Sequence, residues 1–341
     1  MSDNVAIVVT SINEPSRMLR QVALGCEKLG QQLIVIGDEA SPAAFDLQGA
    51  RFYSLAAQRE LDFKFSAACP TRQYSRKNIG YLVAAQSGAD IIIDLDDDCT
   101  TFDNFWAPRA RKQTAPAIGD AGWINVHRYF SEANIWPRGL PLDQIKASQP
   151  AFADLSTEDL DCPIQQALTD GDPDVDAIYR LTSTLPITFR NDRRVALKQG
   201  AWSPFNSQNT AWWRAAFPLL YLPTYCRFRM TDIWRSFVAQ RIAWTNDWAV
   251  LFQEPTGSQE RNEHDLMRDF EDEVPGYLHN KKICETLAAL NLKSGIDCLS
   301  ENLIECYESL VALAVFERRE LDLVAAWIDD LTIVPRRAGE I

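Results

Sequence analysis

Short apolar runs alternate with segments of helical periodicity over the first 115 residues of the chain. The apolar runs, which have the composition of buried strands, are residues 5–10, 33–36, 51–55 and 91–95. Residues 16–29 and 78–87 carry apolar side chains at three- and four-residue steps, and a glycine follows each of these two segments. This order of elements predicts an α/β fold, with a mostly parallel sheet between layers of helices.

The alternation weakens after about residue 115. Residues 131–176 are rich in proline, aspartate and glycine, which predicts long loops with short helices. Towards the end of the chain, helical spacing predicts helices at residues 283–290, 303–316 and 320–331. We therefore expect an α/β domain over residues 1–277 and a helical C-terminal extension over residues 278–341. The extension is expected to pack on the domain, to form a dimer contact or to bind a partner.

Composition and charge exclude several classes of function. Apolar residues make up 46% of the chain and charged residues 24%, as in ordinary globular proteins. With 34 basic and 47 acidic side chains, the net charge is −13, which argues against binding nucleic acid through the overall field. The sequence has no run of 18 apolar residues and no basic leader, so we expect a cytoplasmic protein without a transmembrane segment.

The densest chemical signal is the acidic end of the apolar run at residues 91–95. Side chains alternate along a strand, so Asp94, Asp96 and Asp98 are expected on one side, and Asp97 is expected to point away. Asp94 still belongs to the strand, whereas Asp96 and Asp98 form a D-x-D pair at its tip. Such hard oxygen ligands suit Mg²⁺ or Mn²⁺, which would also bind the phosphates of a substrate. The alternative is a solvated acidic turn or a helix cap.

Polar residues also follow the first two predicted strands. Thr10, Asn13 and Glu14 lie at the end of the first strand, and Asp38 follows the second. Ligands bind beyond the carboxyl ends of strands in open α/β sheets, where an acidic residue often hydrogen-bonds a ribose. We therefore expect these four side chains to contact a nucleotide.

A basic helix start lies between these strands and the acidic run. Arg76, Lys77 and Asn78 stand at the beginning of the helix predicted at residues 78–87. Helix N-termini attract anions, and two cations strengthen that tendency. We expect these three residues to contact a phosphate or a base, and the alternative is an ordinary solvated helix end.

Two later segments have the composition of a sugar site. Asn206, Gln208 and Asn209 lie in a run of neutral hydrogen-bonding residues between aromatic side chains, which suits the hydroxyls and the C–H face of a sugar. An asparagine-rich turn explains the same run. The acidic loop at residues 171–176 either orients a sugar or caps the helix that follows it.

Asp232 and His264 are the last two candidates. Asp232 opens a helical segment, where it is either an N-cap or a general base that accepts a proton from a substrate hydroxyl. His264 is one of only three histidines and is a candidate third metal ligand, although a lone surface histidine is the commoner case.

Several segments occur in the same order in the STELLO-type, glycosyltransferase-like family, which the chain therefore resembles. The segments that carry the resemblance are residues 10–15, 76–81, 93–98, 135–142, 170–177, 204–210, 232–235 and 261–264. The resemblance covers roughly residues 5 to 277, and the C-terminal helices lie outside it. A weaker similarity connects the triple aspartate to reversibly glycosylated polypeptides, which act as sugar mutases.

The resemblance implies a GT-A-type glycosyltransferase with a Rossmann-like, nucleotide-sugar-binding sheet. Asp96 and Asp98 would bind Mn²⁺ or Mg²⁺ and the diphosphate, His264 would be the third ligand, and Asp232 would activate the acceptor if the reaction inverts. The expected donor is a nucleotide-diphosphate sugar, and the expected acceptor is a saccharide or a lipid-linked saccharide of bacterial surface-polysaccharide synthesis. The alternatives are a sugar-nucleotide mutase and a catalytically silent scaffold. Contact with the inner membrane face and homo-oligomerisation stay open.

Overall fold

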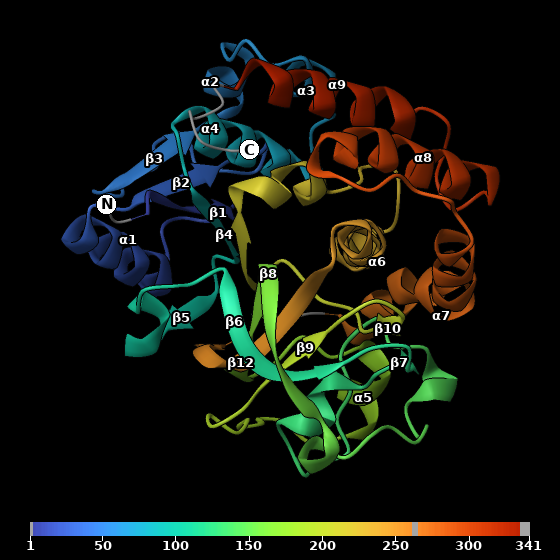
Figure 1. The fold of residues 1–341 in the computed structure, drawn as a ribbon. Coiled ribbons are helices and arrows are strands. Elements are labelled where there is room, and N and C mark those ends of the chain that lie inside the picture. Colours follow the sequence, from blue (N-terminus) through green and yellow to red (C-terminus); the bar gives the residue numbers. More distant parts are fainter. Residues whose placement is uncertain (1–2, 261–264, 335–341) are drawn as a thin grey trace.

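A single ten-stranded sheet organises the part of the chain that the computed structural model describes, residues 3–260 and 265–334 (Figure 1). Its strand order is β3-β2-β1-β4-β11-β8-β6-β9-β12-β5. The strands are β1 (Val5–Thr10), β2 (Gln32–Ile36), β3 (Ala50–Tyr53), β4 (Ile91–Leu95), β5 (Cys99–Thr101), β6 (Lys112–Ile118), β8 (Ser156–Gly171), β9 (Arg194–Leu197), β11 (Asn209–Trp213) and β12 (Trp248–Gln259). Strands β7 (Gly122–Trp123) and β10 (Ala201–Trp202) form a separate pair.

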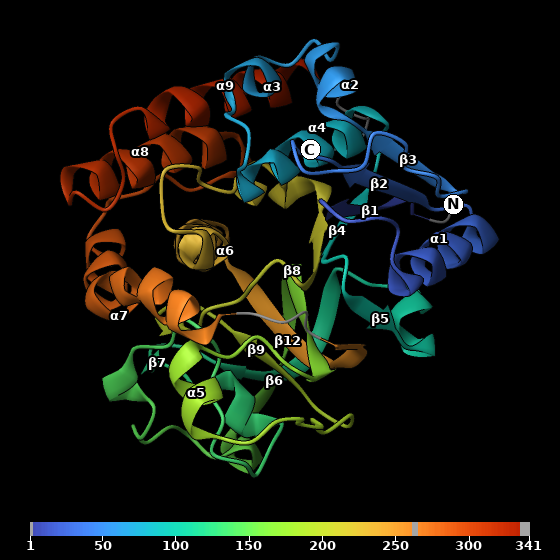
Figure 2. The ribbon, with the colours of Figure 1, turned by 180° about the vertical axis from the view of Figure 1, so that it is seen from behind.

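Helices α1 (Arg17–Leu29) and α4 (Lys77–Gln86) lie on opposite faces of the sheet at β1 and β2, and further helices lie beyond the sheet (Figure 2). The other helices are α2 (Leu55–Arg59), α3 (Lys64–Ala68), α5 (Ala177–Thr182), α6 (Thr231–Ala243), α7 (Leu266–Ala288), α8 (Leu299–Ala312) and α9 (Glu320–Ile333). These elements confirm the predicted α/β class and the helical segment at the C-terminal end of the chain. No helix of the described residues is both long enough and apolar enough to cross a membrane.

The first four strands of the sheet order, β3-β2-β1-β4, are its parallel part, as the sequence predicts. Alternate side chains of β1 enter two different cores: Ala6 and Val8 pack towards α4, and Ile7 and Val9 pack towards α1. The strand is therefore buried on both faces, which explains why its sequence is continuously apolar. At Gly80 of α4, an added Cβ would lie 2.5 Å from Val8, so the helix approaches the sheet as closely as its backbone allows.

Beyond β4 the sheet becomes mixed. Strand β11 pairs antiparallel with β4 and with β8, and β8 also pairs antiparallel with β6 and parallel with β12. Sequence periodicity predicted loops over residues 131–176, and the 16-residue strand β8 inside that region is a difference from the prediction. Its first half is mostly polar because that half is partly exposed, so the strand has no continuous apolar run.

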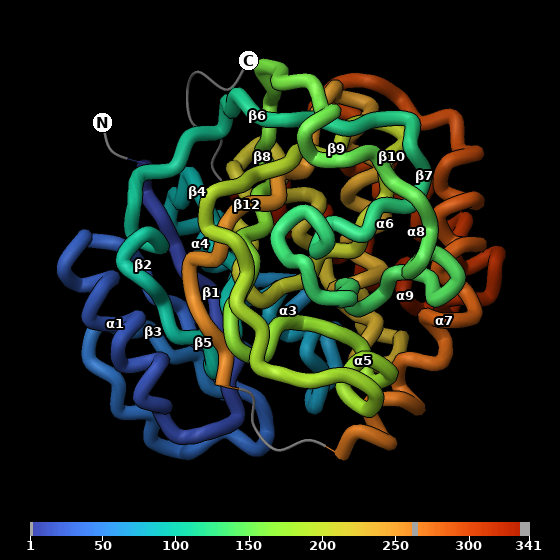
Figure 3. The backbone as a smooth tube through the Cα atoms, turned by 90° about the horizontal axis from the view of Figure 1, so that it is seen from below, coloured from blue at the N-terminus to red at the C-terminus, as the bar shows by residue number. Residues whose placement is uncertain are grey.

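The C-terminal helices are joined to the rest of the chain by buried carboxylates. Figures 1 and 2 show α9 alongside α3, and Figure 3 shows α7 to α9 on the side opposite α1 and β3. Asp330 of α9 accepts hydrogen bonds from the backbone N–H groups of Lys64 (2.9 Å) and Phe65 (2.8 Å). The expected boundary between residues 277 and 278 lies inside α7. The packing of these helices therefore supports the first of the three expected roles of the extension.

We predict that Glu320→Ala destabilises the whole chain. The Glu320 carboxylate is fully buried and accepts from the backbone N–H groups of Thr224 (3.0 Å) and Tyr225 (2.7 Å) and from the Tyr221 hydroxyl (2.5 Å). Removing it leaves buried donors without an acceptor, which we expect to lower the free energy of unfolding by about 2–4 kcal/mol. Urea denaturation measures this, and Asp322→Ala, which removes an exposed carboxylate from the same helix turn, should have little effect.

Acid sensitivity is expected from His127. Burial lowers the pKa of this imidazole from 6.5 to about 3, so the unfolded chain binds its proton at a higher pH than the folded chain. The stability that the neutral imidazole contributes is present above pH 6.5 and is lost as the pH falls from about 6.5 towards 3. Denaturation at a series of pH values measures this loss. Between these pH values, the free energy of unfolding should fall less steeply in His127→Gln than in the unmodified chain, by up to about 1.4 kcal/mol per pH unit. Parallel stability curves for the two proteins would contradict the prediction.

Candidate functional site

A cavity of about 710 Å³ opens at the carboxyl ends of β1, β2 and β4, facing the loop before β11 and the start of α6. Its volume lies in the range of small-molecule sites. The predicted site residues that line it are Thr10, Asn13, Asp38, Arg76, Asp96, Asp98, Asn206, Gln208 and Asp232. Segments that are far apart in the sequence, from residue 10 to residue 232, therefore share one cavity.

Asp96 lies in the loop after β4, and one of its two carboxylate oxygens contacts neighbouring side chains. Its Oδ1 accepts a hydrogen bond from the Tyr74 hydroxyl (3.0 Å) and lies 3.4 Å from the Lys77 ammonium. Burial raises the pKa of Asp96 to about 7, Lys77 opposes the shift, and the nearby Asp98 adds to it. A cation bound beside these carboxylates would relieve their mutual repulsion.

The two following carboxylates are oriented by different strands. Asp97 accepts a hydrogen bond from the Ser11 hydroxyl at 2.5 Å, so it faces the loop after β1, and it also lines the cavity. Asp98 accepts from the Gln259 side chain at 2.8 Å, at the end of β12. The acidic loop is therefore supported on both sides.

The donor set at Asp96 and Asp98 fits a hard divalent cation. Two carboxylates that line the same cavity supply oxygen ligands, and water and phosphate oxygens complete the usual coordination of Mg²⁺ or Mn²⁺. No group of three histidine, cysteine or acidic residues with metal-binding geometry occurs within residues 3–260 and 265–334. His264, the predicted third ligand, lies outside the described residues.

Asp94 has a structural position below the loop. It is fully buried and forms ion pairs with Lys77 (2.6 Å) and Arg235 (2.8 Å). Lys77 is also fully buried and does not line the cavity, which differs from its expected contact with a phosphate. In this position its ammonium stabilises the acidic loop from inside the protein.

Other predicted ligand residues are engaged in internal hydrogen bonds. Arg76 lines the cavity, but its guanidinium donates to the Gln58 side chain (2.5 and 2.9 Å) and to the Cys69 carbonyl (2.8 Å). Asn78 forms two hydrogen bonds with the backbone of Leu222, at 2.8 and 2.9 Å. These side chains therefore hold neighbouring loops, and a direct ligand contact would require them to exchange partners.

Asn209 and Glu14 also differ from the expected arrangement. Asn209 donates to the Thr256 hydroxyl at 2.8 Å, and its side chain is buried beside β12, outside the cavity lining. Glu14 is exposed and lies outside the lining as well. Neither position favours the predicted contact with a ligand.

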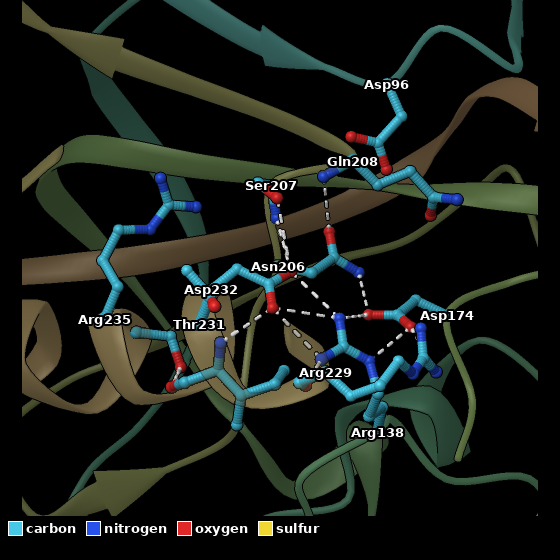
Figure 4. A network of polar contacts seen from close by, with 12 residues as sticks. Asp96, Arg138, Asp174, Asn206, Ser207, Gln208, Arg229, Thr231, Asp232 and Arg235 are labelled. Carbon is cyan, nitrogen blue, oxygen red and sulfur yellow. Dashed lines mark hydrogen bonds and ion pairs between the residues drawn. The ribbon is translucent and has the colours of Figure 1, made fainter. Parts of the chain in front are cut away.

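Opposite the acidic loop, a buried arginine joins two carboxylates (Figure 4). Arg138 donates to both oxygens of Asp174 at 2.7 Å and to Asp232 at 2.9 Å. Burial alone would raise the pKa of Asp174, but the Arg138 and Arg229 guanidinium groups hold it well below its usual range. The two arginines therefore favour the ionised form of Asp174 in this wall of the cavity.

Asp232 connects this wall to the loop before β11. Its Oδ2 accepts from the Ser207 backbone N–H (3.2 Å) and hydroxyl (3.3 Å), and both of its oxygens lie within 3.1 Å of Arg138. Accepting a proton from a substrate would require one of these donors to move. The general-base role therefore stays a prediction, and the observed contacts show a residue that positions Ser207 and Arg138.

Sequence reasoning did not select Arg138, Tyr74 or Phe228 as site residues. Arg138 is separated from its partners by 36 and 94 residues, so no local spacing indicates the pairing. Phe228 is 56% exposed at the cavity and packs edge-to-face on Tyr74. The occurrence of Arg138 within a motif shared with the STELLO-type family was the one available signal.

Comparison with known proteins confirms that resemblance. Residues 229–339 match the family model described as STELLO glycosyltransferases. The chain is therefore similar to STELLO-type proteins. Probable glycosyltransferase STELLO2 of Arabidopsis thaliana is 29% identical over 350 residues, and STELLO1 of the same plant is 28% identical over 349. Each alignment covers 96% of this chain and 44% of the relative, so the chain spans less than half the length of these proteins.

The STELLO match continues to residue 339 and includes the C-terminal helices. The expectation that the resemblance ends at residue 277 was therefore wrong.

Among solved structures, glucosyl-3-phosphoglycerate synthase from Mycobacterium tuberculosis, in complex with Mn²⁺, UDP and glucosyl-3-phosphoglycerate, has a TM-score of 0.41 at 12% identity. That alignment covers 82% of this chain and 80% of the synthase. A second solved structure, described as a mycobacterial protein, has a TM-score of 0.40 at 12% identity, with coverages of 82% and 74%.

Proposed function

We propose that the chain is a GT-A-type glycosyltransferase that uses a nucleotide-diphosphate sugar and a divalent metal. The observation that carries the proposal is the cavity in which Asp96 and Asp98, at the end of a buried parallel strand, face polar residues from the ends of β1 and β2. The STELLO-type sequence supports the same reaction class, since the plant relatives are described as probable glycosyltransferases.

In this proposal the cavity has a donor end and an acceptor end. Thr10, Asn13 and Asp38 contact the nucleoside, and Asp96 and Asp98 hold Mn²⁺ or Mg²⁺ beside the diphosphate. The bound metal would neutralise the charge that develops on the departing diphosphate. His264 is proposed as a further ligand of that metal.

The acceptor end is the wall that contains Arg138, Asp174 and Asp232, with Asn206 and Gln208 beside it. Carboxylate and amide groups in a buried network offer fixed acceptors and donors to sugar hydroxyls. Asp232 is the candidate base for an inverting reaction. A saccharide or lipid-linked saccharide acceptor, a cytoplasmic location and a role in bacterial surface-polysaccharide synthesis stay predictions.

A thermal-shift experiment on the full chain tests the donor assignment. We expect UDP, GDP or ADP, or one of their sugar conjugates, to raise the melting temperature with Mn²⁺, and EDTA to abolish the shift. A ligand at a hundred times its Kd stabilises the folded state by about 2.7 kcal/mol, which is readily measured. The absence of any metal-dependent shift across this panel would contradict the proposal. Conversion of a nucleotide-pyranose into a ring-contracted product, without an acceptor, would instead identify a mutase.

A further inference from the structure

Lys77 contacts two functional segments of the cavity although it is completely buried. Its ammonium lies close to five oxygens: Asp94 Oδ1 at 2.6 Å, the Leu95 carbonyl at 2.8 Å, the Tyr74 hydroxyl at 3.1 Å, the Ser207 carbonyl at 3.3 Å and Asp96 Oδ1 at 3.4 Å. An ammonium has three protons, so these oxygens form a crowded shell around one charge.

The shell joins parts of the chain that are distant in sequence. Lys77 is the first residue of α4, Leu95 and Asp96 belong to the end of β4 and its acidic loop, and Ser207 lies 130 residues away in the loop before β11. Ser207 in turn contacts Asp232. One side chain therefore connects the proposed donor end of the cavity to its proposed acceptor end.

The charge of Lys77 also offsets a concentration of carboxylates. Asp94 and Asp96 both lie within 3.4 Å of the ammonium. Together with Tyr74, Lys77 engages Oδ1 of Asp96, which leaves Oδ2 as the oxygen free of these two contacts.

We propose that Lys77 is a positioning residue, an internal counter-ion that presents one oxygen of Asp96 to the metal and fixes the Ser207 loop relative to it. The inference rests on the proposed function of the cavity. Lys77 acts through Asp96 and Ser207, because its buried side chain lies outside the cavity lining.

Arg235 provides a matched control within the same ion-pair network. It forms an ion pair with the other oxygen of Asp94 at 2.8 Å, and its side chain is 1% exposed. Within the described part of the chain, Arg235 also contacts the Tyr81 hydroxyl and the Trp212 ring. Removing either cation takes one buried partner from Asp94, but only Lys77 also contacts Asp96 and Ser207.

The test compares Lys77→Met and Arg235→Met in the full chain. We expect both variants to be less stable in urea denaturation, because each leaves Asp94 with one cation instead of two. Only Lys77→Met should weaken Mn²⁺-dependent UDP binding in titration calorimetry, by about tenfold to a hundredfold, as is typical for residues that orient metal ligands. Unchanged binding by Lys77→Met, or equal weakening by Arg235→Met, would overturn the inference.

A second pair of variants covers the case in which Lys77→Met does not fold. Lys77→Arg keeps the charge, but a planar guanidinium cannot occupy a shell built around one nitrogen, so metal-dependent binding should still weaken. Arg235→Lys should bind UDP and Mn²⁺ as the unmodified chain does, and equal binding by both conservative variants would overturn the inference. Failure of the unmodified chain to bind any nucleotide with Mn²⁺ would instead overturn the proposed function itself.

Discussion

Replacing Asp96 by alanine is expected to abolish metal-dependent nucleotide binding and to lower sugar transfer by at least about a hundredfold. The side chain lies at the start of the acidic loop, and its Oδ2, which neither Tyr74 nor Lys77 contacts, is the proposed metal ligand. Without it, the metal loses a charged ligand and the diphosphate loses its counter-ion. Removing the metal from the unmodified chain with EDTA should have the same effect, and added Mn²⁺ should restore activity.

The measurements are nucleotide binding by calorimetry and release of UDP, or of the nucleotide that the thermal-shift panel identifies. Asp103→Ala is the matched control, because it removes an exposed carboxylate shortly after the same loop. Full binding and activity in both Asp96→Ala and EDTA-treated protein would contradict a metal site at Asp96. Loss of binding in the Asp103 variant would show instead that the loop responds to any loss of negative charge.

The largest stability effect is expected for Arg138→Met. Arg138 is the buried cation between Asp174 and Asp232, so its removal leaves the buried Asp232 and the largely buried Asp174 with fewer partners. Breaking one side of a buried ion pair typically costs about 3–5 kcal/mol, and we expect a loss of that size in urea denaturation. The double variant Arg138→Met with Asp174→Asn should recover part of the loss, because one uncompensated charge is removed.

The variant Arg111→Met tests whether the stability loss in Arg138→Met depends on burial or on the geometry of the ion pair. Arg111 forms an equally close two-point pair with Asp161, at 2.6 and 2.7 Å, but its side chain is 31% exposed. We expect Arg111→Met to cost only about 0–1 kcal/mol, since water solvates the charge that remains. Equal losses in the Arg111 and Arg138 variants would contradict the assigned role of burial.

Local patterns predicted the parallel part of the fold well. The apolar runs at β1, β2 and β4 and the helical periodicity of α1 are consequences of burial on a sheet face, which the sequence records directly. Strand β8 escaped prediction because it is partly exposed, and its partners β6, β11 and β12 lie elsewhere in the chain. A strand of that kind acquires its hydrogen bonds only when the sheet assembles.

In the candidate site, too, local sequence predicted some features, and tertiary packing decided others. Asp96 and Asp98 were predictable because a carboxylate pair at the end of a buried strand is a local pattern, and both line the cavity. Lys77 and Asn78 were expected at a ligand because they begin a helix, yet both are turned inside by partners distant in sequence. Sequence position indicated that these residues lie near the site, and packing decided which way they face.

By itself, the sequence determined the α/β class, the acidic loop and the STELLO-type relationship, because each depends on neighbouring residues or on motif order. Only the tertiary structure decided that Arg138 joins Asp174 to Asp232 and that Lys77 supports Asp96 from below. These pairs join residues that are 19, 36 and 94 positions apart, so they depend on how strands and helices meet. The free energy of burying such charges favours one arrangement of partners, and no local pattern encodes that choice.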